Sequence, residues 1–123
     1  MNISPEVFGP YFWGALHTAC LGSRDPESLR NFVNSYPLVL PCGACRFHFE
    51  KVLAENPLPE SDDPIVLFEW SVLVHNIVNA KIGKPTITPE VAFDSLFGTK
   101  INFNMIVFFA VLLLGLIFFI LKL

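Results

Sequence analysis

Two cysteines separated by two residues carry the clearest chemical signal in this chain. Cys42 and Cys45 follow Pro41 and precede residues that favour a helix, which places one thiol at a helix start and the other in its first turn. The positive end of the helix dipole favours a thiolate there, and a thiolate exchanges readily with other disulfides. The same Cys-x-x-Cys spacing also suits zinc, so the motif alone leaves both kinds of cysteine chemistry open.

The third cysteine, Cys20, lies in an apolar stretch with no cysteine two or three residues away. We therefore interpret it as a buried thiol of the core. A zinc site remains an alternative, because His17 and Cys20 together with Cys42 and Cys45 offer four ligands of suitable type. In that alternative the chain is a zinc-stabilised, membrane-anchored scaffold or a virion assembly protein.

A second group of polar residues lies in the segment from Trp70 to Lys84. His75 and Asn79 are four residues apart and share a face of the predicted helix. His and Asn are weak helix formers, so their presence favours contacts with a planar polar group, and the lysines at the end of the segment can reach anionic groups. A solvated polar face explains the same spacing equally well.

The segments that carry these residues all have the pattern of helices. The ten prolines mostly bracket the apolar stretches, within which apolar side chains recur at helical spacing. Strand-like alternation is almost absent, so we predict an all-α fold, a four-helix bundle with a short fifth helix. The predicted helices span residues 10–21, 26–36, 43–55, 64–82 and 88–96.

The C-terminal segment is apolar on all sides. Residues 105–121 contain no charged side chain, and counting from Ile101 gives an apolar segment of 21 residues. As a helix at about 1.5 Å per residue, this segment has roughly the 30 Å thickness of a bilayer core. We therefore predict a head domain over residues 1–100 and a C-terminal transmembrane helix over residues 101–123. Since no basic and apolar leader opens the chain, we expect a single-pass, tail-anchored protein with a cytosolic head.

The charge balance argues against one broad class of function. The formal net charge is −3, with 11 acidic residues against 8 lysines and arginines. A nucleic-acid-binding domain needs a basic surface, so we expect no nucleic-acid partner. Three cysteines also do not make the disulfide framework of a small secreted domain, which favours a reactive pair plus one single thiol.

Three motifs together resemble the FAD-linked sulfhydryl oxidases of the Erv/ALR type. They are Gly9-Pro10-x-x-Trp13-x-x-x-His17-Thr18, then Pro41-Cys42-x-x-Cys45, then Trp70-x4-His75-Asn76-x-Val78-Asn79-x-Lys81-x-Gly83-Lys84-Pro85. They occur in the family's order and cover most of residues 8–85. The short head is most similar to the versions carried by large cytoplasmic DNA viruses.

The resemblance implies that the bundle binds FAD. Cys42 would meet the incoming thiols, and Cys45 would lie against the isoalloxazine ring as the charge-transfer thiolate. Lys81 and Lys84 would face the pyrophosphate or ribose, whereas a surface or capping role explains His48 as well as a flavin contact does. The expected cofactor-binding residues are Gly9, Trp13, His17, His48, Trp70, His75, Asn76, Asn79, Lys81 and Lys84, and no metal ligands are expected.

The implied activity is that of a flavin-linked thiol oxidase, which makes disulfides in partner proteins and passes electrons to oxygen to give hydrogen peroxide. The implied partners are a protein dithiol, with a thioredoxin-like carrier as one candidate, oxygen, and a second copy of the chain in a homodimer. For the membrane we expect a host membrane derived from the endoplasmic reticulum or the inner membrane of a virion. The activity would then serve disulfide formation in viral proteins.

The chain departs from the family pattern in its remaining cysteines. Many members carry a structural disulfide where Val72 and Ser95 stand here, and often a separate shuttle Cys-x-x-Cys in a flexible tail. Neither pair exists in this sequence. We therefore expect electrons to arrive directly at Cys42–Cys45 from a partner's dithiol.

Overall fold

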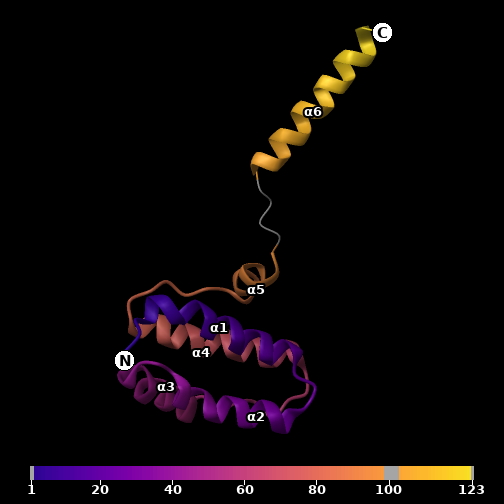
Figure 1. Ribbon diagram of the computed structural model, residues 1–123. Coiled ribbons are helices and arrows are strands. Elements are labelled where there is room, and N and C mark those ends of the chain that lie inside the picture. Colours follow the sequence, from indigo (N-terminus) through magenta and orange to yellow (C-terminus); the bar gives the residue numbers. More distant parts are fainter. Residues whose placement is uncertain (1, 99–102, 123) are drawn as a thin grey trace.

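The computed structural model describes residues 2–98 and 103–122, and it is built from helices joined by short links (Figure 1). No strand occurs in this part of the chain, and the prediction of an all-α fold is confirmed. The elements are α1 (Pro5–Gly22), α2 (Pro26–Ser35), the 3₁₀ helix η1 (Tyr36–Val39), α3 (Gly43–Glu55), α4 (Pro64–Lys81), α5 (Pro89–Phe97) and α6 (Phe103–Lys122).

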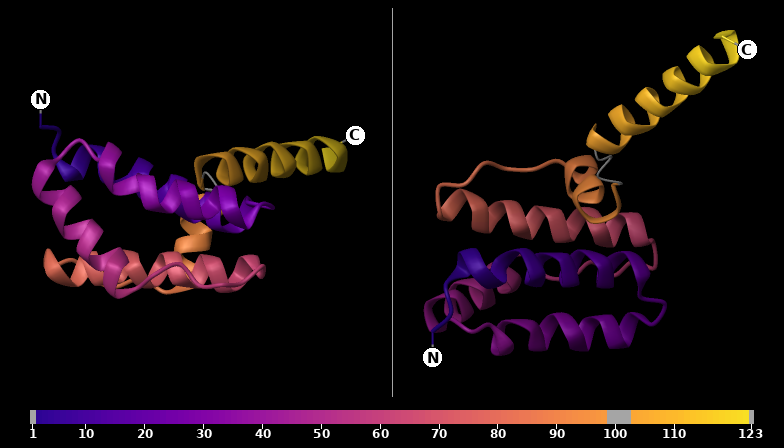
Figure 2. Two further views of the ribbon diagram at one scale, coloured as in Figure 1. Left: turned by 90° about the horizontal axis from the view of Figure 1, so that it is seen from below. Right: turned by 45° about the horizontal axis from the view of Figure 1, so that its top comes forward.

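Helices α1 and α4 lie side by side along most of their length, and α2 and α3 run beside them, joined through η1 (Figures 1 and 2). The core lies between these four helices. Leu16 of α1, Val52 of α3 and Val74 of α4 are almost completely buried in it. Burying each such side chain contributes about 1.5–3 kcal/mol, so this cluster fixes how the helices that carry the polar motifs meet.

The starts of three helices follow the pattern that the sequence predicted. Asp25, Asp63 and Thr88 each accept a hydrogen bond from a backbone N–H in the first turn of their helix, and a proline follows each of them. At the other end of α4, Gly83 has a φ of 71°, a conformation that favours glycine and ends the helix.

Helix α1 begins earlier than predicted, at Pro5 rather than at Pro10. Pro5 occupies the first turn, where its missing N–H costs nothing, and Pro10 removes only one hydrogen bond of the helix interior. The extra turn places the Phe8 ring edge-on to the Phe12 ring, with 5.4 Å between centroids. That contact is one of those that stabilise the additional turn.

Helix α5 is attached to α4 by apolar contacts instead of a disulfide. Phe68 and Val72 of α4 form a small buried cluster with Ala92 of α5. Ser95, near the expected second cysteine position, donates its hydroxyl to the backbone carbonyl of Ala92 at 2.7 Å. No cysteine follows Cys45 in the sequence, so no disulfide can form at this position.

None of the helices in the described part of the chain combines the length and the apolarity that crossing a membrane requires. The transmembrane helix predicted over residues 101–123 is therefore not found, and residues 101, 102 and 123 of that prediction lie outside the described residues. In α6, the large apolar side chains from Val107 to Leu121 are 45–80% exposed.

Candidate functional site

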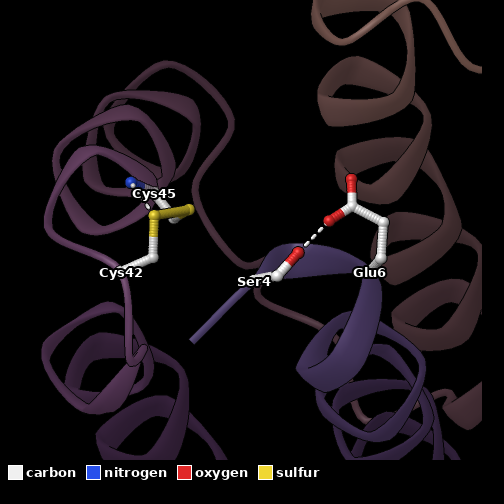
Figure 3. Close-up of a disulfide and its surroundings, with 4 residues drawn as sticks. All are labelled: Ser4, Glu6, Cys42 and Cys45. Carbon is white, nitrogen blue, oxygen red and sulfur yellow. Dashed lines mark hydrogen bonds between the residues drawn. A yellow bond between two sulfur atoms is a disulfide. The ribbon is translucent and has the colours of Figure 1, made fainter. Parts of the chain in front are cut away.

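The two cysteines of the Cys-x-x-Cys motif form a disulfide at the N-terminus of α3 (Figure 3). Cys42 is the N-cap residue, and its sulfur accepts a hydrogen bond from the backbone N–H of Cys45 at 3.2 Å. The beginning of α1, at Ser4 and Glu6, lies beside this pair (Figure 3). The sulfurs therefore sit at the positive end of a helix dipole, which stabilises a thiolate when the disulfide opens.

A cavity of about 720 Å³ opens next to the disulfide, between α1, α3, α4 and the segment that follows α4. A volume of this size is typical of sites for large cofactors or ligands. Cys45 is in its wall, whereas Cys42 is not among the residues that line it. One cysteine of the disulfide thus borders the cavity, while the other stands at the helix start.

Flat aromatic rings form one side of the cavity. The indole of Trp13 stacks on the imidazole of His75, with 4.0 Å between ring centroids and 9° between ring planes. The Phe49 ring meets the same indole edge-on at 5.6 Å. These rings are positioned by three different helices, and they give the cavity a planar wall suited to a flat, conjugated ligand.

A buried hydrogen-bonded chain lies behind this wall. His17 Nδ1 is 2.7 Å from the Ser71 hydroxyl, and His17 Nε2 is 3.1 Å from His75 Nδ1. Burial lowers the pKa of His17 to about 4. Burial, together with the nearby His17 and Lys84, also lowers the pKa of His75 to about 4. Both imidazoles are therefore neutral at physiological pH.

We expect the thermal stability of the protein to fall as the pH is lowered from about 6.5 to about 4. An unfolded chain binds protons at these two histidines near their ordinary pKa of 6.5, while the folded chain binds them only near 4, so the free energy of unfolding decreases within that window. Melting temperatures across this range test the effect. A His17→Gln variant should lose less of its melting temperature between these pH values. An equal loss in both proteins would show that the lowered pKa of His17 does not cause the fall in stability.

Most of the predicted cofactor-binding residues line the cavity, and two do not. The indole N–H of buried Trp70 donates to the backbone carbonyl of Asn56 at 3.1 Å. The Asn76 amide bonds both the N–H and the carbonyl of Ile87, each at 2.8 Å, which holds the segment after α4 in place. The predicted residues in the lining are Gly9, Trp13, His17, His48, His75, Asn79, Lys81 and Lys84.

Sequence reasoning missed part of the lining. Phe12, Tyr36 and Val52 border the cavity, and the Tyr36 hydroxyl donates to the backbone carbonyl of Phe12. Tyr36 belongs to η1, which follows α2 directly and which the helical pattern did not separate from it.

Cys20 was predicted from the sequence to be a buried thiol of the core. The structure is consistent with this prediction, because Cys20 is fully buried, and burial raises its pKa to about 12.

The zinc alternative finds no support in the described residues. No group of three or more His, Cys, Asp or Glu side chains in residues 2–98 and 103–122 is arranged to hold a metal ion. The two ring nitrogens of His17 face Ser71 and His75, and Cys42 and Cys45 are bonded to each other. Three of the four proposed ligands are therefore engaged elsewhere, and the fourth, Cys20, is a free buried thiol.

Comparison with known proteins connects this site to one family. A sequence model of the Erv1 / Alr family matches residues 10–98. A protein of Acanthamoeba polyphaga mimivirus named "Probable FAD-linked sulfhydryl oxidase R368" is 34% identical over 102 residues, which cover 76% of this chain and 71% of the relative. The "FAD-linked sulfhydryl oxidase" of African swine fever virus is 31% identical over 91 residues, 66% of this chain and 72% of the relative.

The fold has a solved counterpart. The crystal structure of the FAD binding domain of Erv1 from Saccharomyces cerevisiae superposes with a TM-score of 0.67 and 26% sequence identity. The superposition covers 79% of this chain and 98% of the yeast domain.

Proposed function

The chain belongs to the Erv1 / Alr family, and we propose from its site that it is an FAD-linked sulfhydryl oxidase acting on protein dithiols. One observation carries this proposal most directly: Cys45 borders the aromatic cavity, while Cys42 of the same disulfide lies outside the lining. This arrangement gives a thiol-disulfide exchange site on one side and a cofactor site on the other. The oxidation of a dithiol needs both.

The residues of the cavity fit FAD. Its volume of about 720 Å³ and the stacked pair Trp13–His75 suit a large ligand with flat ring systems. Lys81 and Lys84 line the same cavity and carry the positive charge that a pyrophosphate attracts. Asn79, His17 and His48 would complete the binding residues, with no metal ligand among them. When bound, FAD would accept two electrons from the reduced cysteines and return them to oxygen as hydrogen peroxide.

The exchange steps take place on this chain's own sulfur atoms. A substrate thiolate attacks Cys42 Sγ, the Cys42–Cys45 bond breaks, and Cys45 leaves as a thiolate that carries the bonding electron pair. The substrate's second thiol then attacks the mixed disulfide, which releases an oxidised substrate and leaves Cys42 reduced. The N-terminus of α3 stabilises the negative charge through these steps. Cys45 is then placed at the cavity wall to pass the electron pair onward.

The absorption spectrum of the purified full-length chain tests this function. We expect a yellow protein with roughly one FAD per chain and no stoichiometric zinc, which oxidises a protein dithiol with release of hydrogen peroxide. A colourless protein that contains bound zinc would show that the zinc scaffold, not the oxidase, is correct.

We also propose that residues 1–100 form the oxidase domain and that residues 101–123 associate with a membrane. The support is the row of large apolar side chains from Val107 to Leu121, each of them at least 45% exposed. Flotation of the full-length chain with lipid vesicles should carry the protein upward, and a Leu113→Asp variant should float less. Recovery of both proteins in the unbound fraction would contradict the proposal.

The remaining parts of the proposal depend on the family and on its viral members. We propose a homodimer, a cytosolic head on a membrane derived from the endoplasmic reticulum or of a virion, and a role in disulfide formation in viral proteins. The viral relatives support that role. The protein dithiol that donates electrons, for which a thioredoxin-like carrier is one candidate, would dock where Cys42 is accessible.

A further inference from the structure

A serine behind the cavity wall is hydrogen-bonded to the histidine pair. Ser71 of α4 is completely buried and does not line the cavity. Its hydroxyl oxygen is 2.6 Å from the backbone carbonyl oxygen of Phe68 and 2.7 Å from His17 Nδ1. His17 Nε2 is in turn 3.1 Å from His75 Nδ1. The four groups form one chain that runs from the interior of α4 to the cavity.

The direction of this chain is determined by the single proton of the hydroxyl. A carbonyl oxygen can only accept, so the contact between two oxygens at 2.6 Å needs the Ser71 proton. The Ser71 oxygen must then accept the hydrogen bond from His17, which places the proton of the neutral imidazole on Nδ1. If Ser71 donated to His17 instead, two lone pairs would face each other at the Phe68 carbonyl.

The same reasoning continues to the cavity. Because His17 Nε2 carries no proton, it accepts from His75 Nδ1, and the proton of neutral His75 is on Nδ1. His75 Nε2 is then left as an unprotonated acceptor. The hydrogen bond that the His75 ring forms within the described residues is at Nδ1, and His75 is one of the residues that line the cavity.

We propose that Ser71 is a positioning residue that fixes the tautomers of His17 and His75, so that His75 presents a hydrogen-bond acceptor to an N–H or O–H group of the bound cofactor. This inference rests on the proposed function for the identity of the ligand. The tautomers themselves depend only on the protein. Without Ser71, His17 can carry its proton on Nε2, donate to His75 Nδ1, and thereby leave a donor N–H on His75 Nε2. His75 would then present a hydrogen-bond donor to the cavity instead of an acceptor.

The test compares Ser71→Ala with the unchanged full-length chain. We expect ¹⁵N NMR of the imidazoles to show Nδ1–H on both histidines in the unchanged protein, and a loss of this single tautomer in Ser71→Ala. The dissociation constant for FAD should increase about tenfold, because a mismatched buried hydrogen bond costs on the order of one decade in affinity. Ser71→Thr keeps the hydroxyl, so this variant should retain the Nδ1–H tautomer of both histidines.

Cys20→Ala is the matched control. Cys20 is as deeply buried as Ser71 and lies near its hydroxyl, so this change opens a similar space without removing the bond to His17. It should leave the tautomers and the FAD affinity unchanged. If Ser71→Ala does not fold, ¹⁵N NMR of the unchanged chain still tests the proposal. A proton on Nε2 of either His17 or His75 would overturn it.

Unchanged tautomers and unchanged FAD affinity in a folded Ser71→Ala protein would overturn it as well. Failure of the proposed function has a different signature, because a chain that binds no FAD at all still reports its imidazole tautomers by NMR.

Discussion

A Cys42→Ser chain is expected to lose all turnover with protein dithiols and yet to keep its FAD. Serine cannot form the mixed disulfide with a substrate thiol, so the first exchange step has no sulfur to attack. Cys42 does not line the cavity, so its replacement leaves the cofactor site intact. Cys45 then remains as a free thiol at the cavity wall, next to the N-terminus of α3, where a thiolate is favoured.

The comparison with Cys45→Ser separates the two cysteines. In Cys42→Ser we expect a long-wavelength absorption band from the Cys45 thiolate beside the flavin, and in Cys45→Ser we expect neither this band nor activity. Visible spectra and dithiol oxidation assays on both purified proteins measure these outcomes. Identical spectra for the two variants would contradict the assignment of Cys45 to the cofactor side. Thr18→Ala, an exposed change on α1 that removes a hydroxyl bonded only to backbone carbonyls, serves as a control with normal activity.

Trp13→Ala is expected to produce a protein that has lost nearly all of its FAD. The indole forms the stacked wall with His75 and packs edge-on against Phe49, so alanine leaves one side of the cavity open. Loss of stacking and of apolar contact area together is expected to weaken FAD binding roughly 100-fold. The ratio of flavin to protein absorbance after gel filtration measures the effect.

The chain's other tryptophan provides a matched control. Trp70 is 6% exposed and packs in the core, where its indole N–H bonds the Asn56 carbonyl. Trp70→Phe removes this hydrogen bond and should lower the free energy of unfolding by about 1 kcal/mol, with FAD content unchanged. A greater loss of flavin from Trp70→Phe than from Trp13→Ala would contradict the placement of the two side chains.

Helices whose ends carry strong local signals were predictable from the sequence. Helix α3 was predicted at its observed bounds, and α4 was predicted one residue too long, because caps, prolines and Gly83 act within a single turn. The start of α1 was wrong, since the rule that proline ends a helix does not include the packing of Phe8 on Phe12. The two rings are four residues apart in the sequence, so this contact is local to α1 and follows from helical spacing.

The two predicted residues that do not line the cavity lie on other faces of α4 than His75. Trp70 is five residues from His75, about 140° around the helix, and so it points into the core instead of the cavity. Asn76 is about 100° from His75 and bonds the segment after α4. The His17–His75 contact joins residues 58 positions apart, and Ser71 gave no signal in the sequence, because its role arises only when α1 and α4 pack together.

The apolar cluster of Phe68, Val72 and Ala92 has a consequence for the resistance of the protein to reducing agents. This cluster attaches α5 to α4 by side-chain packing alone, so the contact contains no disulfide that a thiol reagent could cleave. The Cys42–Cys45 bond is the sole disulfide that this chain's three cysteines form, and Cys20 remains a free buried thiol. Substrates that reduce the enzyme on every cycle therefore act on a bond between residues only three positions apart, and they find no bond to cleave where α5 is attached to α4.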